Sequence, residues 1–370
     1  MTGVIDLSSG QVIEPLAEPA LKALAQTVSG PEVTAYAASC GETGLRSAVA
    51  AHYARRVGSD VDPEQITVTA GGRHGLFSVV TASASGGEIL VPEPRWSHYP
   101  EMLRLAGARP VRVPGDPANG WLPDPDRLEA ARNGRTKALV VNSPVNPTGA
   151  VYDTGTLAAI RAWCARHGLL LVVDDIYWAY GGEDAGGVRA GPCEAVVGGA
   201  SKVHALAGLR IGWVWADAPL TAAVRNIVEH TTGPVSTLAQ SAVAAVLDRQ
   251  QDSVPDRARR LAALREHAVR AMSAVPGVSV IVPHGGIYLC LDASGLAKAR
   301  PEWRDDRVLC AELAEHAGVR LRPGSTFGLP GHVRLCVAAA PGLLSEAADR
   351  LSKFLGTAAN GTAEKSEGLR

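Results

Sequence analysis

Lysine is scarce in this 370-residue chain, where it accounts for six of the 36 basic side chains. Charge of one sign is not in excess either, because 37 acidic side chains leave a net charge of −1. Bulk charge is therefore excluded as a route to nucleic acid or to a membrane surface. Apolar runs such as LLLVV at 169–173 fall far short of the roughly 20 residues of a membrane helix. The start, MTGVIDLSSG, lacks a secretory pattern, so we expect a cytoplasmic protein with no membrane or nucleic-acid partner.

Cysteine is sparse and scattered. The six cysteines form no Cys-x-x-Cys pair, and histidines lie near them only in isolation, with Cys164 and His167 the closest in sequence. This spacing indicates neither a zinc site, nor an iron–sulfur cluster, nor a disulfide framework. We expect no metal, and we interpret the cysteines as core residues.

Short apolar runs alternate with helical stretches, beginning with an amphipathic helix at 42–57 and continuing to a long helical segment at 219–273. Continuous apolar strands separated by helices are typical of βαβ units and of a parallel sheet covered on both faces, so the fold class is α/β. The expected strands are 66–69, 88–91, 110–113, 138–142, 169–173, 195–198 and 211–215.

The pattern changes after the long helical segment, where VSVIVP, IYLCLD, VRLRP and VRLCVA indicate a second, smaller α/β domain. We therefore assign 1–45 to an N-terminal arm and part of the small domain, 46–270 to a large domain and 271–356 to the small C-terminal domain. The small, polar residues of 357–370 are typical of a disordered tail.

Ligands of such sheets bind at the carboxyl ends of the strands. Residues 70–75, AGGRHG, follow the first strand and suit either a tight turn or a phosphate at a helix start. In NSPVNPTG the prolines hold Asn146 on a rigid loop, where it could bind a ligand or make an Asx turn. Asp174 and Asp175 end a buried strand, which is costly unless a partner pairs them.

Lys202 directly follows the strand at 195–198. Desolvation there would lower its pKa, and a partly neutral lysine can form a Schiff base with an aldehyde. The other five lysines lie in polar or terminal surroundings, or precede a strand on the side away from the expected site. Lys202 is therefore the only good candidate for a Schiff base.

Together these segments resemble the class I/II aminotransferases, the pyridoxal-phosphate enzymes of the aspartate aminotransferase fold. The matching motifs occur in the family's order and span about residues 5 to 355. They are YAASCGETGLR, VPEPRWSHYP, NPTG, VVDDIY, ASKVHALAGLRIGW, GVRLRPGSTFG and VRLCVA. The resemblance implies a large domain with a mostly parallel seven-stranded sheet sandwiched by helices, and a smaller α/β domain built from the N-terminal arm and the C-terminal part.

The resemblance also implies a role for each matching residue. Lys202 should carry pyridoxal 5'-phosphate and move the substrate proton, and Asp174 should pair with the ring nitrogen. Arg334 should bind the substrate carboxylate, with Asn146 and Gly10 also on the substrate side. The other implied cofactor contacts are Asn146 and Tyr177 at the ring oxygen, Trp96 on the ring face, Gly72, Arg73, Ser201 and Arg210 near the phosphate, and Tyr36 reaching the site of the other subunit of a homodimer.

Four features depart from the family pattern. Gly199 stands where the family usually has a phosphate-binding Ser or Thr, and Asp175 replaces the commoner Glu. The loop around Gly10 and the region of His98 are also unusual, which argues against an ordinary dicarboxylic or aromatic substrate. We interpret His74, His98 and His204 as structural.

The resemblance favours transamination between an L-amino acid and a 2-oxo acid. Elimination, replacement or cyclisation at Cβ or Cγ in the same fold is the alternative, because all these reactions begin with the same Cα carbanion, formed when Cα loses its proton. A non-catalytic ligand-binding relative is a third reading, against which the presence of Lys202 argues.

Overall fold

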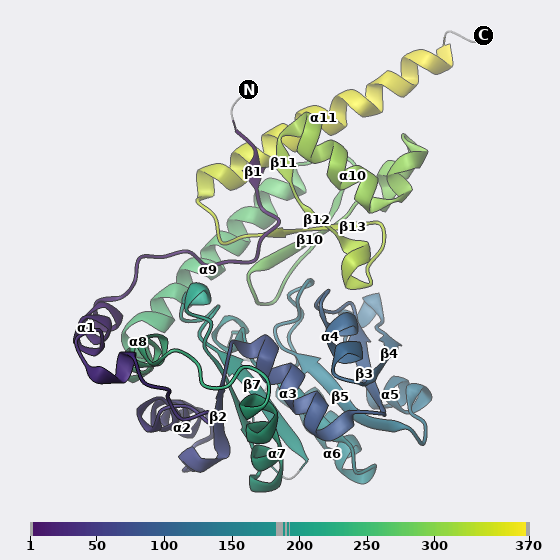
Figure 1. Ribbon diagram of the computed structural model, residues 1–370. Coiled ribbons are helices and arrows are strands. Elements are labelled where there is room, and N and C mark those ends of the chain that lie inside the picture. The colour runs from purple at the N-terminus through teal and green to yellow at the C-terminus, as the bar shows by residue number, and fades with distance from the viewer. Residues whose placement is uncertain (1–2, 183–187, 189–190, 192, 368–370) are drawn as a thin grey trace.

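The computed structural model describes residues 3–182, 188, 191 and 193–367 (Figure 1). A seven-stranded sheet, in the order β2-β8-β7-β6-β5-β3-β4, forms the centre of its larger part. β8 runs antiparallel to both of its neighbours, and the remaining pairs are parallel, so the prediction of a mostly parallel sheet is confirmed. The strands are β2 (Ile66–Thr69), β3 (Glu88–Glu93), β4 (Arg109–Pro114), β5 (Thr136–Asn142), β6 (Leu170–Asp174), β7 (Glu194–Gly199) and β8 (Gly212–Ala216).

Helices cover both faces of this sheet, as apolar residues on both faces of its strands require. Side chains alternate along β6, for example, so that Leu171 and Val173 pack in one core layer and Val172 packs in the other. The first layer includes residues of α1 (Glu18–Thr27), α2 (Thr43–Val57), α5 (Pro125–Ala131), α6 (Thr154–Arg166) and α8 (Thr237–Asp248). The second includes residues of α3 (Gly72–Ala84), α4 (Tyr99–Leu105) and α7 (Ala218–Glu229).

The smaller part joins the two ends of the chain (Figure 1). The N-terminal strand β1 (Ile5–Asp6) pairs in parallel with β11 (Val319–Arg320), which confirms that the arm contributes to this part. A four-stranded antiparallel sheet, β12-β13-β10-β9, lies beside the long helices. Its elements are α9 (Gln250–Ser273), β9 (Ser279–Ile281), β10 (Tyr288–Asp292), α10 (Asp306–Glu312), β12 (Arg322–Pro323), β13 (His332–Cys336) and α11 (Pro341–Glu367).

The prediction for the long helical segment was wrong in one respect. The segment 219–273 is not one helical stretch, because α7, α8 and α9 are separate helices. Gly233 has a φ of +62° and Pro234 follows it, which ends the first helix, and the side chain of Ser236 then caps α8. Near the C-terminus, α11 continues to Glu367, into the segment for which composition predicts a disordered tail. Alanine and glutamate in that segment support a helix.

Within the described ranges, no helix is long and apolar enough to span a membrane.

Candidate active site

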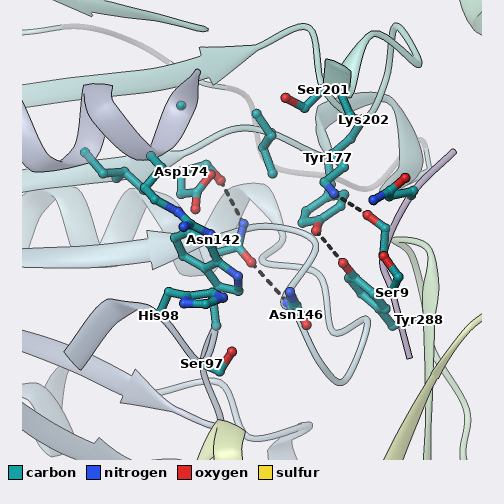
Figure 2. A pocket seen from close by; sticks show the side chains of 18 of the residues that line it. Ser9, Ser97, His98, Asn142, Asn146, Asp174, Tyr177, Ser201, Lys202 and Tyr288 are labelled. Atoms are coloured by element: carbon teal, nitrogen blue, oxygen red, sulfur yellow. Dashed lines mark hydrogen bonds between the residues drawn. The ribbon is translucent and has the colours of Figure 1, made fainter. Parts of the chain in front are cut away.

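A cavity of about 530 Å³ opens at the carboxyl ends of β5, β6 and β7. Its opposite walls come from Ser8–Gln11 of the arm and from Tyr288 of β10. Figure 2 shows Asp174, Lys202 and Asn146 directed toward this space. All but one of the residues predicted for the site line it, namely Gly10, Gly72, Arg73, Trp96, Asn146, Asp174, Tyr177, Ser201, Lys202, Arg210 and Arg334.

Asp174 is the last residue of β6 and is buried. The hydroxyl of Tyr99 donates a hydrogen bond to its Oδ2 at 2.5 Å, and Asn142 Nδ2 donates to its backbone carbonyl at 3.0 Å. Burial raises the pKa of Asp174 to about 6, against the opposing effect of the Tyr99 hydrogen bond. No cationic side chain in the described part of the chain forms an ion pair with it, so this carboxylate can accept a positive group of a ligand.

Lys202 follows β7, and its ammonium donates to the backbone carbonyl of Gly10 in the arm. Burial lowers the pKa of Lys202, and the charges of Arg334 and Arg210 act in the same direction. The hydroxyl of Tyr180 donates to the Lys202 carbonyl at 3.0 Å, which fixes the backbone of this turn. A buried amine of lowered pKa at a cavity wall is suited to nucleophilic and acid–base chemistry.

The start of α3 and the β7–β8 connection form an anion site. Gly71, at φ +80°, directs the chain into α3, whose first backbone N–H groups have no partner within the helix. The guanidinium of Arg210 lies against this turn, since a Cβ added to Gly71 would be 2.6 Å from its Nη2. Arg210 itself has a φ of +58°, an uncommon conformation for arginine that directs its side chain here.

Arg334 lies on β13 and is held rigidly. Its guanidinium carbon is 4.1 Å from the Tyr288 ring centroid and 4.6 Å from that of Phe327. Its Nη1 donates to Asn146 Oδ1 at 3.1 Å and its Nη2 to the Ser8 carbonyl at 2.6 Å. Nε is buried without a partner, and no carboxylate of the described residues pairs with Arg334, which suits it to a carboxylate ligand.

Aromatic side chains line the rest of the cavity. The hydroxyls of Tyr177 and Tyr288 are 3.0 Å apart, and Trp96 packs edge-on against Tyr99 with ring centroids separated by 5.3 Å. The guanidinium carbon of Arg73 lies 5.2 Å from the Trp96 ring centroid. Trp96, Tyr177 and Tyr288 thus place aromatic rings on the lining of the cavity.

Comparison with known proteins agrees with this geometry. The family model "Aminotransferase class I and II" matches residues 2–351. The chain belongs to this family. Aspartate/prephenate aminotransferase of Thermus thermophilus is 36% identical over 351 residues, covering 93% of this chain and 88% of that protein. Aspartate aminotransferase of Streptomyces avermitilis is 34% identical and covers 96% of this chain and 90% of its own length.

A solved structure of Thermus thermophilus aspartate aminotransferase with maleate has a TM-score of 0.87 at 32% identity, covering 95% of this chain and 91% of that one. The protein is thus an aminotransferase, and pyridoxal 5'-phosphate is its cofactor. Elimination, replacement or cyclisation is not favoured by these relatives.

The donor set of the cavity fits pyridoxal phosphate. Asp174 is a buried carboxylate with no ion-pair partner among the described residues, as a pyridinium nitrogen needs. The α3 N-terminus and Arg210 supply donors for a phosphate, and Lys202 supplies an amine for the aldehyde. The three features lie on one cavity wall at the sheet edge.

Gly199, the departure from the family pattern, is explained by packing. A Cβ added to this glycine would lie 3.0 Å from Ile176 Cδ1 and 3.2 Å from the Ile211 carbonyl. A Ser or Thr side chain at this position would therefore press on Ile176 and on the Ile211 carbonyl, and these neighbours would have to shift by a few tenths of an ångström. Ser201 lines the cavity and remains as a hydroxyl near this wall.

Tyr36 is the one predicted site residue outside the cavity, and its side chain is 97% exposed. Sequence reasoning missed Tyr99 and Tyr288, which bond Asp174 and Tyr177, and Arg322, which lines the opening. Tyr99 could have been found from its place three residues after Trp96. Of the histidines, His204 is fully buried, as a structural residue is, whereas His98 lines the cavity.

Proposed function

We propose that this aminotransferase uses an L-amino acid with an acidic side chain, aspartate first among them, as donor and a 2-oxo acid as acceptor. The observation that carries the proposal is the convergence of Lys202, Asp174 and Arg334 on one cavity from three different elements. The substrate class rests on the named activities of the relatives and on the excess of cationic side chains around the cavity. It departs from the expectation drawn from the loops near Gly10 and His98.

Different residues of the cavity would hold different parts of the cofactor. Asp174 would hold the ring nitrogen in its protonated form, with Tyr99 orienting the carboxylate. Arg210 and the N–H groups at the start of α3 would hold the phosphate. Trp96 would cover the ring, and Asn146 and Tyr177 would hydrogen-bond the ring oxygen. Ser201 and the backbone of Arg73 complete the proposed contacts. When bound, the cofactor supplies an electron sink for the charge released at the substrate Cα.

Lys202 would move the proton. Its lowered pKa increases the fraction of neutral amine that can accept a proton from the substrate Cα. The Gly10 carbonyl, which accepts from its Nζ, orients this amine toward the arm side of the cavity. The same amine, once protonated, can return the proton to a carbon of the cofactor. Hydrolysis by water would then release the oxo acid, while the amino group would stay on the cofactor.

Arg334 would bind the substrate α-carboxylate. Two aromatic rings and two backbone or amide oxygens already fix its guanidinium, so little side-chain entropy is lost when a carboxylate binds. Asn146 links Arg334 to the loop after β5, so a carboxylate held by Arg334 is placed relative to the cofactor wall.

We also propose a homodimer with shared sites. Tyr36 is almost fully exposed, and exposed apolar residues lie on the same arm, including Ile13 at 84% and Leu21 at 52%. A second copy that covers this arm would bury these side chains and would bring Tyr36 to the phosphate-binding residues of its neighbour.

The assigned domain limits and a cytoplasmic location stay predictions.

A single-turnover experiment tests the proposed function. Purified holoenzyme is mixed with one amino acid and no oxo acid, and the released oxo acid is measured against the enzyme concentration. We expect about one oxo acid per site from aspartate, because the amino group stays on the enzyme. Ammonia release with repeated turnover would instead indicate elimination and overturn the proposal.

A further inference from the structure

The cavity has more positively charged side chains than are needed to bind the cofactor phosphate and one substrate carboxylate. Of the described side chains that line it, Asp174 is the only acid, whereas Lys202 and four arginines are basic. Arg210 has a role at the phosphate wall and Arg334 at the α-carboxylate. Arg73 and Arg322 then remain without an anionic partner, and neither forms an ion pair among the described residues.

Arg322 lies directly beside Arg334. β12 and β13 are antiparallel, and the Cα partner of Arg322 in this register is Arg334. Directly opposite residues of an antiparallel pair stand on the same face of a sheet, and like charges in that position repel each other. Both side chains line the cavity. Two anionic groups of one ligand, one on each guanidinium, would remove this repulsion.

His98 faces the same region from the large domain. It precedes α4, its ring centroid is 5.0 Å from that of Trp96, and Figure 2 shows it across the pocket from Lys202. Burial lowers the pKa of His98, and the charges of Arg73 and then of Arg322 lower it further. Two arginines from different domains are thus near enough to act on one histidine at the opening of the cavity. A neutral imidazole there still has one N–H to donate.

We infer that Arg322 and His98 determine specificity by binding the acidic group at the end of the substrate side chain, with Arg322 as its ionic partner and His98 as a hydrogen-bond donor. The inference rests on the proposed function and deepens it. Arg334 and Arg322, neighbours across two strands, would then hold the two carboxylates of one dicarboxylic amino acid. Arg322 is exposed, and its guanidinium forms no ion pair in the part of the chain that the structure describes.

The test compares Arg322→Gln with wild type and with Arg320→Gln as a matched control. Arg320 is exposed, lies two positions away and pairs with Asp6 instead of lining the cavity. Each holoenzyme is assayed for kcat/KM with aspartate and with alanine, which has no second carboxylate. We expect the aspartate-to-alanine ratio to fall about 10- to 100-fold in R322Q, as for a lost charged hydrogen bond, and to keep its wild-type value in R320Q. His98→Gln should lower the same ratio by a smaller factor, about 3- to 10-fold.

Binding of maleate, followed by calorimetry, gives a second readout that does not depend on turnover. We expect R322Q to raise the Kd of maleate by a factor similar to its effect on the ratio. An unchanged ratio and an unchanged maleate Kd in R322Q would overturn the inference, even if wild type strongly prefers aspartate. Wild type that releases no oxo acid from aspartate would contradict the proposed donor instead, and a maleate Kd raised in R322Q would then still support the anionic subsite.

Discussion

Tyr99 and Asp174 are joined by a buried hydrogen bond of 2.5 Å, in which the phenol donates to the carboxylate. Burial raises the pKa of Asp174 to about 6, and this bond works against that rise. Asp174 is charged above its pKa and neutral below it. Cofactor affinity that depends on the Asp174 carboxylate should therefore decrease as the pH falls through about 6.

Tyr99→Phe removes the bond and so raises the pKa of Asp174 further. We expect the Kd of pyridoxal phosphate at neutral pH to increase about 10-fold, and the fall in affinity to begin at a higher pH than in wild type. Titration of the cofactor-free protein between about pH 5 and 8 measures both effects. Asp174→Asn is the control, since it should remove the part of the pH dependence that belongs to this group. If cofactor affinity has the same pH dependence in Y99F and wild type, the hydrogen bond does not affect the pKa of Asp174.

Arg334→Lys keeps the charge but loses the planar fork that stacks between Tyr288 and Phe327. We expect kcat/KM to fall about 10- to 100-fold for aspartate and for alanine alike, because both have an α-carboxylate. Arg320→Lys, outside the cavity, is the matched control. A loss confined to aspartate would place Arg334 at the side-chain carboxylate and contradict its proposed role.

Gly199→Ser introduces the hydroxyl that the family usually has, at a position where its Cβ would lie only 3.0 Å from Ile176 Cδ1. We expect unfolding free energy to decrease by about 1–3 kcal/mol, the usual cost of overpacking. Chemical denaturation of the cofactor-free protein measures this. The double variant Gly199→Ser with Ile176→Val should recover part of the loss, and no recovery would mean that another contact, such as the Ile211 carbonyl, is responsible.

Tyr36 and Lys202 offer a test of shared sites. If each site takes Tyr36 from the other subunit, a mixed dimer of Tyr36→Phe and Lys202→Ala chains contains one complete site. We expect coexpressed, purified mixed dimers to have more activity than the two variant homodimers together. Activity equal to the mean of the two homodimers would show that each chain completes its own site.

Much of the fold was predictable because apolar periodicity reports directly on burial. The seven strands of the large sheet are found close to their expected limits. Lys202 and Asp174 come directly after predicted buried strands, where burying a charged group is costly unless a partner or a ligand compensates. The division of the helical segment at Gly233 could also have been predicted, since Gly and Pro in succession end helices.

The rest depends on contacts between segments far apart in the chain. Nothing local to Arg322 shows that it stands opposite Arg334, because the register of β12 and β13 is set by the packing of the small domain. The crowding of Gly199 by Ile176 likewise arises where two strand ends meet. Tyr288 reaches Tyr177 only because β10 of the small domain faces the large sheet.

The most direct test of the account is to locate the cofactor on the chain. Holoenzyme is reduced with borohydride, digested, and its peptides are sequenced by mass spectrometry. The account predicts that the cofactor is fixed to Lys202, and that Lys202→Ala releases it and lowers oxo acid formation by about 10²- to 10⁴-fold. The matched variant Lys137→Ala, at the exposed start of β5, should retain both label and activity. A label on another lysine, or full activity in K202A, would contradict the account.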